Sequence, residues 1–134
     1  MELIIGGAYQ GKKNTAQKLF GLRNTDILDG ENCKIEDVFS CRAVSEFHML
    51  IRRIMEQQES PEDFFEHLKT ENPGVILISN EIGYGIVPLE RFERDWREKT
   101  GRICCLAAQE SDHVIRVLAG NPVCIKGEQI WLFI

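Results

Sequence analysis

The sequence predicts an α/β fold: an open, mostly parallel sheet with helices on both faces and a hairpin at its C-terminal end. Two observations favour this class. Short apolar segments of strand character alternate along the chain with segments of helical periodicity. One apolar segment, residues 75–78, is continuous rather than alternating, which is typical of a parallel strand buried on both faces.

The N-terminal part predicts a strand, a helix and a second strand. Leu3–Ile5 is a short apolar strand that leads into a glycine-rich segment. The helix after this segment has an apolar side that we expect to be buried, made of Ala16, Leu19 and Phe20. The second strand is predicted at Asp26–Asp29, where Gly30 ends it.

Two helices are predicted in the middle of the chain. The first covers Arg42–Gln58, because apolar residues recur at steps of three and four: Val44, Phe47, Ile51, Ile54 and Met55. The second begins at Ser60, a capping residue followed by Pro61 at the first helical position and by Asp63 three residues after the cap. This helix ends before the turn at residues 72–74.

The C-terminal part predicts a central strand, a long helix and the hairpin. Val75–Ile78 is the central strand. The long helix begins after Pro88, and its apolar side contains Leu89, Phe92, Trp96, Ile103 and Leu106. Gly101 is expected to break or kink it. A strand follows at His113–Ala119, and we expect Val123–Lys126 to pair with Gln129–Ile134 around a turn at residues 127–128.

Length and charge restrict the class of protein. The 134 residues predict a single domain that covers 1–134. The 16 basic and 21 acidic residues leave a net charge of −5, which argues against a broad basic face for nucleic acid. No apolar run could span a membrane, and the N-terminus lacks the features of a secretory signal. Five cysteines without a CxxC pair predict reduced thiols in a cytoplasmic protein.

Gly6, Gly11 and Lys12 have the Gly-x4-Gly-Lys spacing of a phosphate-binding loop, with a strand before and a helix after it. Such a loop turns several backbone N–H groups inward, and the helix N-terminus and the lysine attract phosphate. The sequence therefore predicts a P-loop nucleotide-binding domain whose phosphate contacts come from Gly6, Gly7, Ala8, Tyr9, Gln10, Gly11, Lys12 and Lys13. The alternative is an ordinary glycine turn with a solvated lysine.

Lys13 stands where this pattern has a Ser or Thr hydroxyl that ligates Mg²⁺. An ammonium group cannot ligate Mg²⁺ and repels it, and Thr15 lies on another side of the helix. Two outcomes are open: Lys13 adds a phosphate contact and makes binding less dependent on metal, or the loop is a relic. No protein ligand for a metal is predicted.

Asn80 and Glu81 follow directly after the predicted central strand. The carboxyl edge of an open α/β sheet holds the ligand crevice, and the glycine loop opens at the same edge. Glu81 could therefore reach a metal or a bound nucleotide. The alternative is a glutamate that packs within its own loop.

Residues 6–13 read GGAYQGKK and residues 78–88 read ISNEIGYGIVP. With these segments the chain resembles the bifunctional cobinamide kinase/cobinamide-phosphate guanylyltransferases of cobalamin synthesis. That family opens with a strand, GGAxSGKS and a helix, and later has a strand ending in SNE[VI]GxGIVP. The likeness covers residues 1 to about 20 and 75 to about 126.

The resemblance implies a P-loop fold, binding of GTP or ATP, and transfer of phosphate and then GMP to the side chain of a corrinoid such as cobinamide. It also implies a homo-oligomer, a trimer in that family. By matching motif positions, Gly6, Gly7, Gly11 and Lys12 would hold phosphates, and Asn80 and Glu81 would belong to the active-site edge. Lys12 and Glu81 are the catalytic candidates.

Residues 24–74 depart from the family pattern. The family has there an Asp-Cys-Leu-Thr strand with the expected metal carboxylate, and the chain offers only Asp29, whose commoner role before a glycine is in a turn. The family histidine that accepts GMP falls on Gln57, and an amide is not such a nucleophile, although His48 could substitute. The alternative function is therefore a catalytically impaired member that binds nucleotide, anion or corrinoid without turnover.

Overall fold

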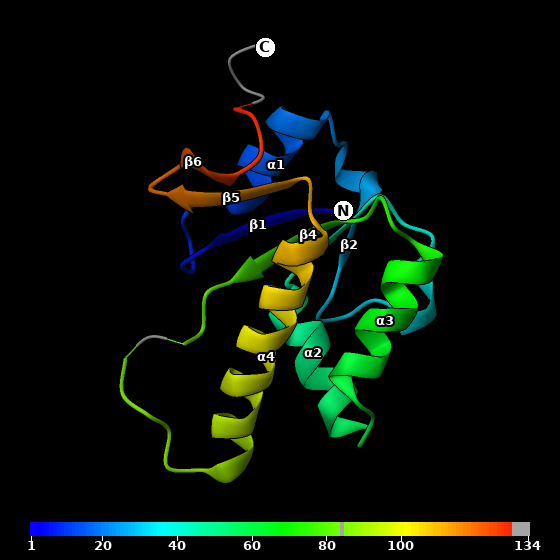
Figure 1. Cartoon of the computed structure of the whole chain (residues 1–134), viewed down its shortest axis with the longest axis vertical. Helices are drawn as coiled ribbons and strands as arrows, with labels where there is room; N and C mark the ends of the chain where they lie inside the picture. The colour runs from blue at the N-terminus through cyan, green and yellow to red at the C-terminus, as the bar shows by residue number, and fades with distance from the viewer. Residues whose placement is uncertain (84, 130–134) are drawn as a thin grey trace.

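A computed structural model of the chain contains a six-stranded sheet with the strand order β2-β3-β4-β1-β5-β6 (Figure 1). The structure describes residues 1–83 and 85–129. Its strands and helices follow one another along the chain as β1 (Glu2–Gly6), α1 (Lys12–Phe20), β2 (Ile27–Asp29), β3 (Ala43–Ser45), α2 (Phe47–Glu56), α3 (Pro61–Glu71), β4 (Ile76–Asn80), α4 (Arg91–Glu110), β5 (His113–Leu118) and β6 (Asn121–Lys126).

The sheet is parallel except at one edge. β1 lies in its middle and pairs in parallel with β4 and with β5. β2 and β3 continue the parallel sheet beyond β4, and β6 closes the other edge in antiparallel pairing with β5. The predicted α/β class with a mostly parallel sheet is therefore confirmed, and the arrangement is consistent with a P-loop NTPase-like fold.

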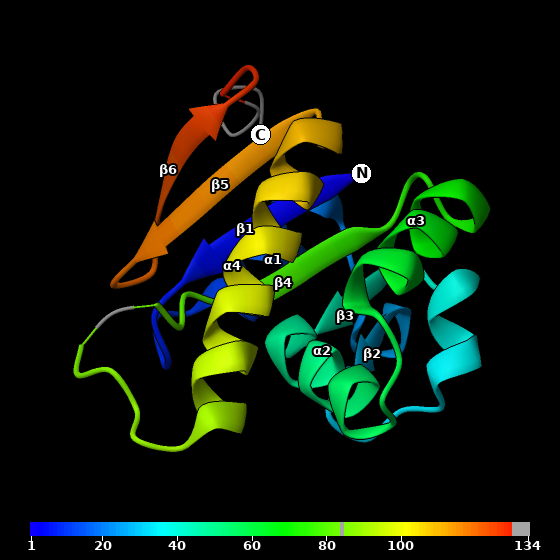
Figure 2. The same ribbon diagram turned by 60° about the horizontal axis from the view of Figure 1, so that its bottom comes forward.

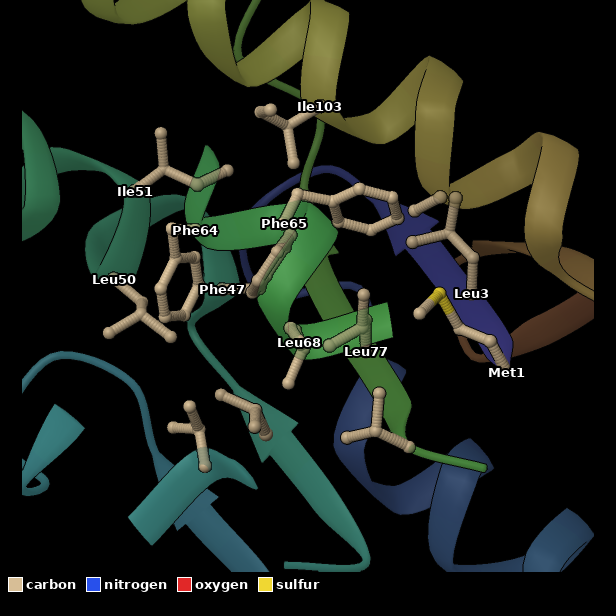
Figure 3. Packing of buried hydrophobic residues seen from close by; sticks show 14 of the residues in the cluster. Met1, Leu3, Phe47, Leu50, Ile51, Phe64, Phe65, Leu68, Leu77 and Ile103 are labelled. Atoms are coloured by element: carbon tan, nitrogen blue, oxygen red, sulfur yellow. The ribbon is translucent and has the colours of Figure 1, made fainter. Parts of the chain in front are cut away.

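Helices cover both faces of the sheet (Figure 2). Leu3 and Leu77 point from the central strands into the larger apolar cluster, which α2, α3 and α4 close with Phe47, Phe65, Leu68 and Ile103 (Figure 3). Alternate residues of the same strands point to the other face. There Ile4, Ile78 and Ile115 pack against Ala16 of α1 in a smaller cluster.

Several local predictions are confirmed. The Ser60 hydroxyl accepts a hydrogen bond from the backbone N–H of Asp63 at 3.2 Å, as expected of an N-cap at the start of α3. Val75 to Ile78 are buried and lie in or next to the central strand β4. Within the described residues, no helix is long and apolar enough to cross a membrane.

The predicted helix over Arg42–Gln58 is wrong at its start, because Ala43–Ser45 form the strand β3. Val44 is fully buried and lies between Leu28 and Leu77 in the sheet. The spacing from Val44 to Phe47 matches a helical step, so periodicity alone extends the helix across a strand of only three residues. Only the sheet neighbours distinguish the two structures here.

Two details of the C-terminal part also differ. α4 runs unbroken through Gly101, and Leu89 precedes this helix with its side chain 95% exposed. The hairpin joins β5 to β6 through Ala119 and Gly120, which both have positive φ angles. The hairpin is therefore made by β5 and β6, whereas the sequence predicts one between Val123–Lys126 and Gln129–Ile134. The predicted partner strand Gln129–Ile134 falls almost entirely outside the described residues.

Candidate functional site

The glycine loop joins the carboxyl end of β1 to the first turn of α1. Tyr9 and Gly11 have φ angles of 60° and 83°, so the backbone curls as the predicted loop requires. Gly11 is the N-cap of α1 and supplies no side-chain acceptor to the first turn. The backbone N–H groups at this helix start are thus open to an anion, which the helix dipole also favours.

A cleft of about 570 Å³ opens above this loop. The glycine loop, the start of α1 and the carboxyl ends of β2, β3 and β4 provide its walls: Tyr9, Gln10, Gly11, Lys12, Lys13, Asn14, Asp29, Glu31, Ser45, Glu46 and Ile78. Its volume lies in the range of small-molecule sites. The structure thus gathers five of the predicted contacts, residues 9–13, around one cleft. Gly6, Gly7 and Ala8 shape the backbone of the loop without lining the cleft.

Lys12 is the most buried cation of this cleft. Its side chain folds back over the loop, and Nζ donates a hydrogen bond to the carbonyl of Gly7 at 2.7 Å. Burial lowers the pKa of Lys12, while the carboxylates of Glu46 and Glu81 act in the opposite direction. The ammonium group therefore lies on the glycine loop with a neutral partner that an anionic oxygen could replace.

Lys13 is exposed beside Lys12 on the wall of the same cleft. Thr15 is buried and faces a different cleft, between α1 and the β5–β6 turn, together with Gly120 and Pro122. The Thr15 hydroxyl therefore cannot take the place of the usual Ser or Thr at position 13. The cationic Lys13 alone occupies that place.

Gln10 fastens the loop to the β5–β6 turn. Its backbone carbonyl accepts from the N–H of Gly120 at 2.9 Å, and its side-chain oxygen accepts from the N–H of Ala119. Gly6 leaves no room for a side chain, since a Cβ there would lie 2.7 Å from the carbonyl oxygen of Val117. The loop conformation thus depends on β5 and on its turn as well as on its own glycines.

Glu81 is held in an ion pair at the carboxyl edge of the sheet. Arg116 of β5 donates to both of its carboxylate oxygens, at 2.9 and 3.0 Å. The Glu81 backbone N–H donates to the carbonyl of Gly6 at 2.8 Å. Asn80 and Glu81 line a smaller cleft against α4 rather than the cleft above the glycine loop. This geometry favours a role in holding the loop, and Arg116 is a partner that the sequence reading missed.

Glu46 is a carboxylate of the main cleft that the sequence reading missed, as is the exposed Glu31. Glu46 follows β3 directly, lines the cleft and has φ and ψ angles of 52° and 42°, a left-handed conformation that is uncommon outside glycine. The signal was present as a carboxylate after a buried strand. The helix predicted over residues 42–58 hides this signal, because it places Glu46 within a helix and away from the sheet edge.

His48 lies directly behind Glu46. Its Nδ1 accepts from the backbone N–H of Asn80 at 3.1 Å, and its Nε2 lies 3.3 Å from a carboxylate oxygen of Glu46. The indole N–H of Trp96 donates to the His48 carbonyl at 2.8 Å. The side chain is buried, and burial, followed by the charge of Lys12, lowers the pKa of His48 to about 4. The ring is thus neutral at physiological pH.

Asp29 and Gln57, the two weaker candidates, serve other purposes in the structure. The Asp29 carboxylate accepts from the backbone N–H of Glu31 and from the side-chain amide of Asn32, which is a turn role even though Asp29 also borders the cleft. Gln57 is the C-cap of α2, at the opposite end of that helix from His48, and lines a separate shallow cleft. Neither residue replaces the catalytic group expected from the resemblance.

The described residues contain no cluster of three or more His, Cys, Asp or Glu that could hold a metal ion by itself. The main cleft nevertheless offers Glu46, whose carboxylate is half-exposed. Mg²⁺ is commonly held by one or two carboxylates, phosphate oxygens and water rather than by a cage of protein ligands. The residues present therefore fit a Mg²⁺ ion that arrives with nucleotide phosphates.

Comparison with known proteins adds independent information. The model of the cobinamide kinase / cobinamide phosphate guanyltransferase family matches residues 38–125. This range contains β3, Glu46, His48, β4 and α4, and it begins after the glycine loop. It also includes residues 38–74, where the sequence reading found no family pattern.

Curated relatives match over shorter segments. The chain is 38% identical over 61 residues to the bifunctional adenosylcobalamin biosynthesis protein CobP of Pseudomonas aeruginosa, which is 45% of this chain and 35% of that protein. It is 42% and 40% identical over 52 residues to the bifunctional adenosylcobalamin biosynthesis proteins CobU of Salmonella typhimurium and Escherichia coli, in each case 39% of this chain and 29% of the relative. The matched segments span about a third of the length of these relatives.

Proposed function

This chain belongs to the cobinamide kinase / cobinamide phosphate guanyltransferase family, and on that premise we propose that it transfers a phosphoryl group from GTP or ATP to a corrinoid side chain in cobalamin biosynthesis. The observation that carries the proposal is the cleft above the glycine loop. It combines an uncapped helix start and the buried cation Lys12 with a carboxylate, Glu46, on the wall formed after β3.

The triphosphate would lie along the glycine loop. Its oxygens would accept from the free N–H groups of the first turn of α1, and Lys12 would exchange its bond to the Gly7 carbonyl for one to a phosphate oxygen. Phosphoryl transfer requires little covalent chemistry from the protein and depends on positioning and on neutralising charge. Lys12 and the helix start supply both functions.

Mg²⁺ would supply charge neutralisation on the phosphates, and Glu46 is the residue that would hold it. Lys13 cannot ligate the ion, but its exposed ammonium group can neutralise a phosphate oxygen on the same wall of the cleft. Part of the charge compensation that the usual hydroxyl-bound metal provides would thus come from the protein. We therefore expect nucleotide binding to depend less on Mg²⁺ than in a loop with Ser or Thr at this position.

The histidines of the chain give less support to guanylyl transfer. His48 is buried, with contacts at both ring nitrogens. His67 lies on α3 beside Phe39, and His113 pairs with Glu2 at the amino edge of the sheet. None of them offers an accessible ring nitrogen to a nucleotide in the main cleft. The proposal is accordingly restricted to the phosphoryl transfer.

A second function is favoured by Lys13 and by the ion pair of Glu81. A member of the family without the hydroxyl ligand, and with its edge carboxylate held by Arg116, could bind nucleotide, anion or corrinoid without turnover. A cytoplasmic location and a homo-trimeric assembly also belong to the proposal. Ile86, Val87 and Leu89, all exposed on the segment between β4 and α4, are apolar residues that an assembly could cover.

The test is transfer of the labelled γ-phosphoryl group from GTP or ATP to cobinamide. We expect the wild-type protein to form phosphorylated cobinamide and Lys12→Met to form none, because the methionine keeps the length of the side chain without its charge. If the wild-type protein binds nucleotide but forms no product, the second function replaces the first. If it binds none of nucleotide, inorganic phosphate and cobinamide, both are wrong.

A further inference from the structure

Glu46 has a backbone conformation that is unfavourable for a glutamate unless the surrounding structure stabilises it. Its left-handed backbone conformation costs an L-residue other than glycine about 1 kcal/mol. It accepts this conformation at the point where β3 ends and α2 begins, one residue before the buried Phe47. The carboxylate itself is 46% exposed in the cleft, so packing alone does not fix its direction.

The protonation of His48 follows from its backbone contact. Nδ1 faces the N–H of Asn80, which can only donate, so Nδ1 must be the bare nitrogen of a neutral ring. Nε2 then carries the proton and lies 3.3 Å from a carboxylate oxygen of Glu46. The imidazole thus lies between Asn80, at the end of β4, and the carboxylate in the cleft, with a hydrogen bond on the first side and a close approach on the second.

His48 is itself held in place. Its side chain is 5% exposed, and its carbonyl accepts from the indole N–H of Trp96 on α4. The imidazole and indole rings lie 6.4 Å apart between centroids and 30° from parallel. The ring therefore cannot turn away from Glu46 without displacing β4, α2 or α4.

The charge of Lys12 explains why the direction of the Glu46 carboxylate matters. Glu46 is close enough to raise the pKa of Lys12, yet no ion pair of Lys12 is found within the described residues, and its Nζ binds the Gly7 carbonyl instead. A free carboxylate in this cleft would be drawn to the ammonium group. It would then occupy the place of the phosphates.

We propose that His48 is a positioning residue, which holds the Glu46 carboxylate apart from Lys12 and directed at the metal-bound phosphates of the nucleotide. The inference rests on the proposed function, because it identifies the residue that orients a carboxylate in the proposed nucleotide cleft. It also explains why a histidine is suited to this position: a neutral ring can accept from a backbone N–H on one side and donate to a carboxylate on the other.

The test compares His48→Leu, which has neither contact, with His48→Gln, whose amide can make both. The dissociation constants of ATP and GTP are measured by calorimetry with and without Mg²⁺. We expect His48→Leu to weaken binding of the Mg²⁺ complex roughly tenfold to a hundredfold, the range for loss of a group that orients a metal ligand. We expect His48→Gln to stay within about threefold of the wild type, so that the conservative side chain rescues binding.

A double-mutant cycle separates positioning from folding. If His48 acts through Glu46, then His48→Leu adds no further loss of Mg²⁺-nucleotide affinity in a Glu46→Gln background. Equal losses in both backgrounds, or equal losses with and without Mg²⁺, would overturn the proposal in favour of a purely structural role. Circular dichroism of each variant confirms that it is folded.

A nucleotide-independent measurement keeps the inference separate from the proposed function. Long-range ¹⁵N–¹H spectra of the free protein should show Nε2 of His48 protonated and Nδ1 bare, and the Nε2 signal should shift in Glu46→Gln. A ring protonated at Nδ1, or a signal that ignores Glu46, would overturn the inference. Failure of the wild-type protein to bind nucleotide would instead contradict the proposed function, and the spectra would still test the link between His48 and Glu46.

Discussion

At the scale of single residues, two neighbouring lysines at the glycine loop have different surroundings. Lys12 is buried and bonded to the loop itself, whereas Lys13 is exposed at the position of a metal-ligating hydroxyl. The spacing of the sequence predicts that both lysines belong to one site, and both line the cleft above the loop. The sequence could not supply the surroundings of Lys12, which are the bonded Gly7 carbonyl and the nearby charge of Glu46, because these depend on how β3 and the loop fold around the helix start.

Lys13→Ser should make nucleotide binding more dependent on Mg²⁺. The substitution removes a cation that repels the ion and adds a hydroxyl of the type that ligates it. Calorimetry with ATP should show a larger ratio between the dissociation constants without and with Mg²⁺ than in the wild type. Lys18→Ser, at an exposed lysine later in α1, is the matched control and should leave the ratio unchanged. An unchanged ratio in Lys13→Ser would contradict the role given to this lysine.

Thr100→Val should stabilise the protein. Thr100 of α4 is 2% exposed, and its hydroxyl is a buried polar group without a hydrogen-bond partner among the described residues. A methyl group of similar shape removes the desolvation cost, so the free energy of unfolding should rise by about 1 kcal/mol. Thr70→Val, which deletes an exposed hydroxyl bonded to the Glu66 carbonyl, should bring no such gain in urea unfolding. A loss of stability in Thr100→Val would show that its hydroxyl has a partner after all.

At the scale of elements, the glycine loop depends on a strand far away in the chain. β5 lies beside β1, and the turn after β5 binds Gln10. The loop is thus held from two sides, by the start of α1 and by the β5–β6 turn. A nucleotide would find the loop already curled, which lowers the entropic cost of binding.

Gly6→Ala should destabilise the protein by about 1–3 kcal/mol, the usual range for an added methyl group in a tightly packed place. The new Cβ would meet the Val117 carbonyl oxygen at 2.7 Å, so β1 and β5 must separate locally. Gly101→Ala is the opposite case, because a Cβ in the middle of α4 meets no atom of the described residues within 4 Å. It should stabilise the helix by about 0.5–1 kcal/mol. Urea denaturation of both variants measures these changes in the free energy of unfolding. An unchanged stability of Gly6→Ala would contradict the close approach of Gly6 to the Val117 carbonyl.

The elements themselves were largely predictable where their signals were long or capped. The Ser60 cap and the continuous apolar run before Asn80 each determined an element correctly. β3 was not predictable in this way, since a three-residue strand carries too little pattern to compete with the helix that follows it. This one error removed Glu46 from the candidate site and separated His48 from the carboxyl edge.

At the scale of the whole molecule, one sheet with two apolar clusters brings the ends of β1, β3 and β4 together. The general class was predictable, because the alternation of strands and helices demands a parallel sheet. The order of the strands was not, and it is this order that places residues 46, 48 and 80 side by side across β3 and β4.

The buried neutral His48 should make stability depend on pH. Its pKa is lowered to about 4 in the folded protein from an ordinary value near 6.5, so the unfolded chain binds a proton that the folded protein rejects. This stability is present above pH 6.5 and is lost as pH falls toward 4. Without nucleotide or metal, the free energy of unfolding should fall by about 2 kcal/mol between pH 7 and pH 5 from this group.

Urea unfolding of the wild-type protein and of His48→Gln at both pH values isolates that contribution. The glutamine does not titrate, so the variant should lose about 2 kcal/mol less than the wild type over this range. Parallel losses in the two proteins would mean that His48 is not held neutral by the fold. The comparison also cancels the contributions of other groups that both proteins retain, such as Glu2, whose pKa is raised by burial.

The central claim is that the cleft above the glycine loop binds a nucleoside triphosphate through Lys12. Calorimetric titration of the wild-type protein and of Lys12→Met with GTP and with ATP, each in the presence of Mg²⁺, tests it most directly. The account predicts saturable one-to-one binding of at least one nucleotide by the wild type and none by Lys12→Met. Absence of binding by the wild type, or equal affinity in Lys12→Met, would contradict it.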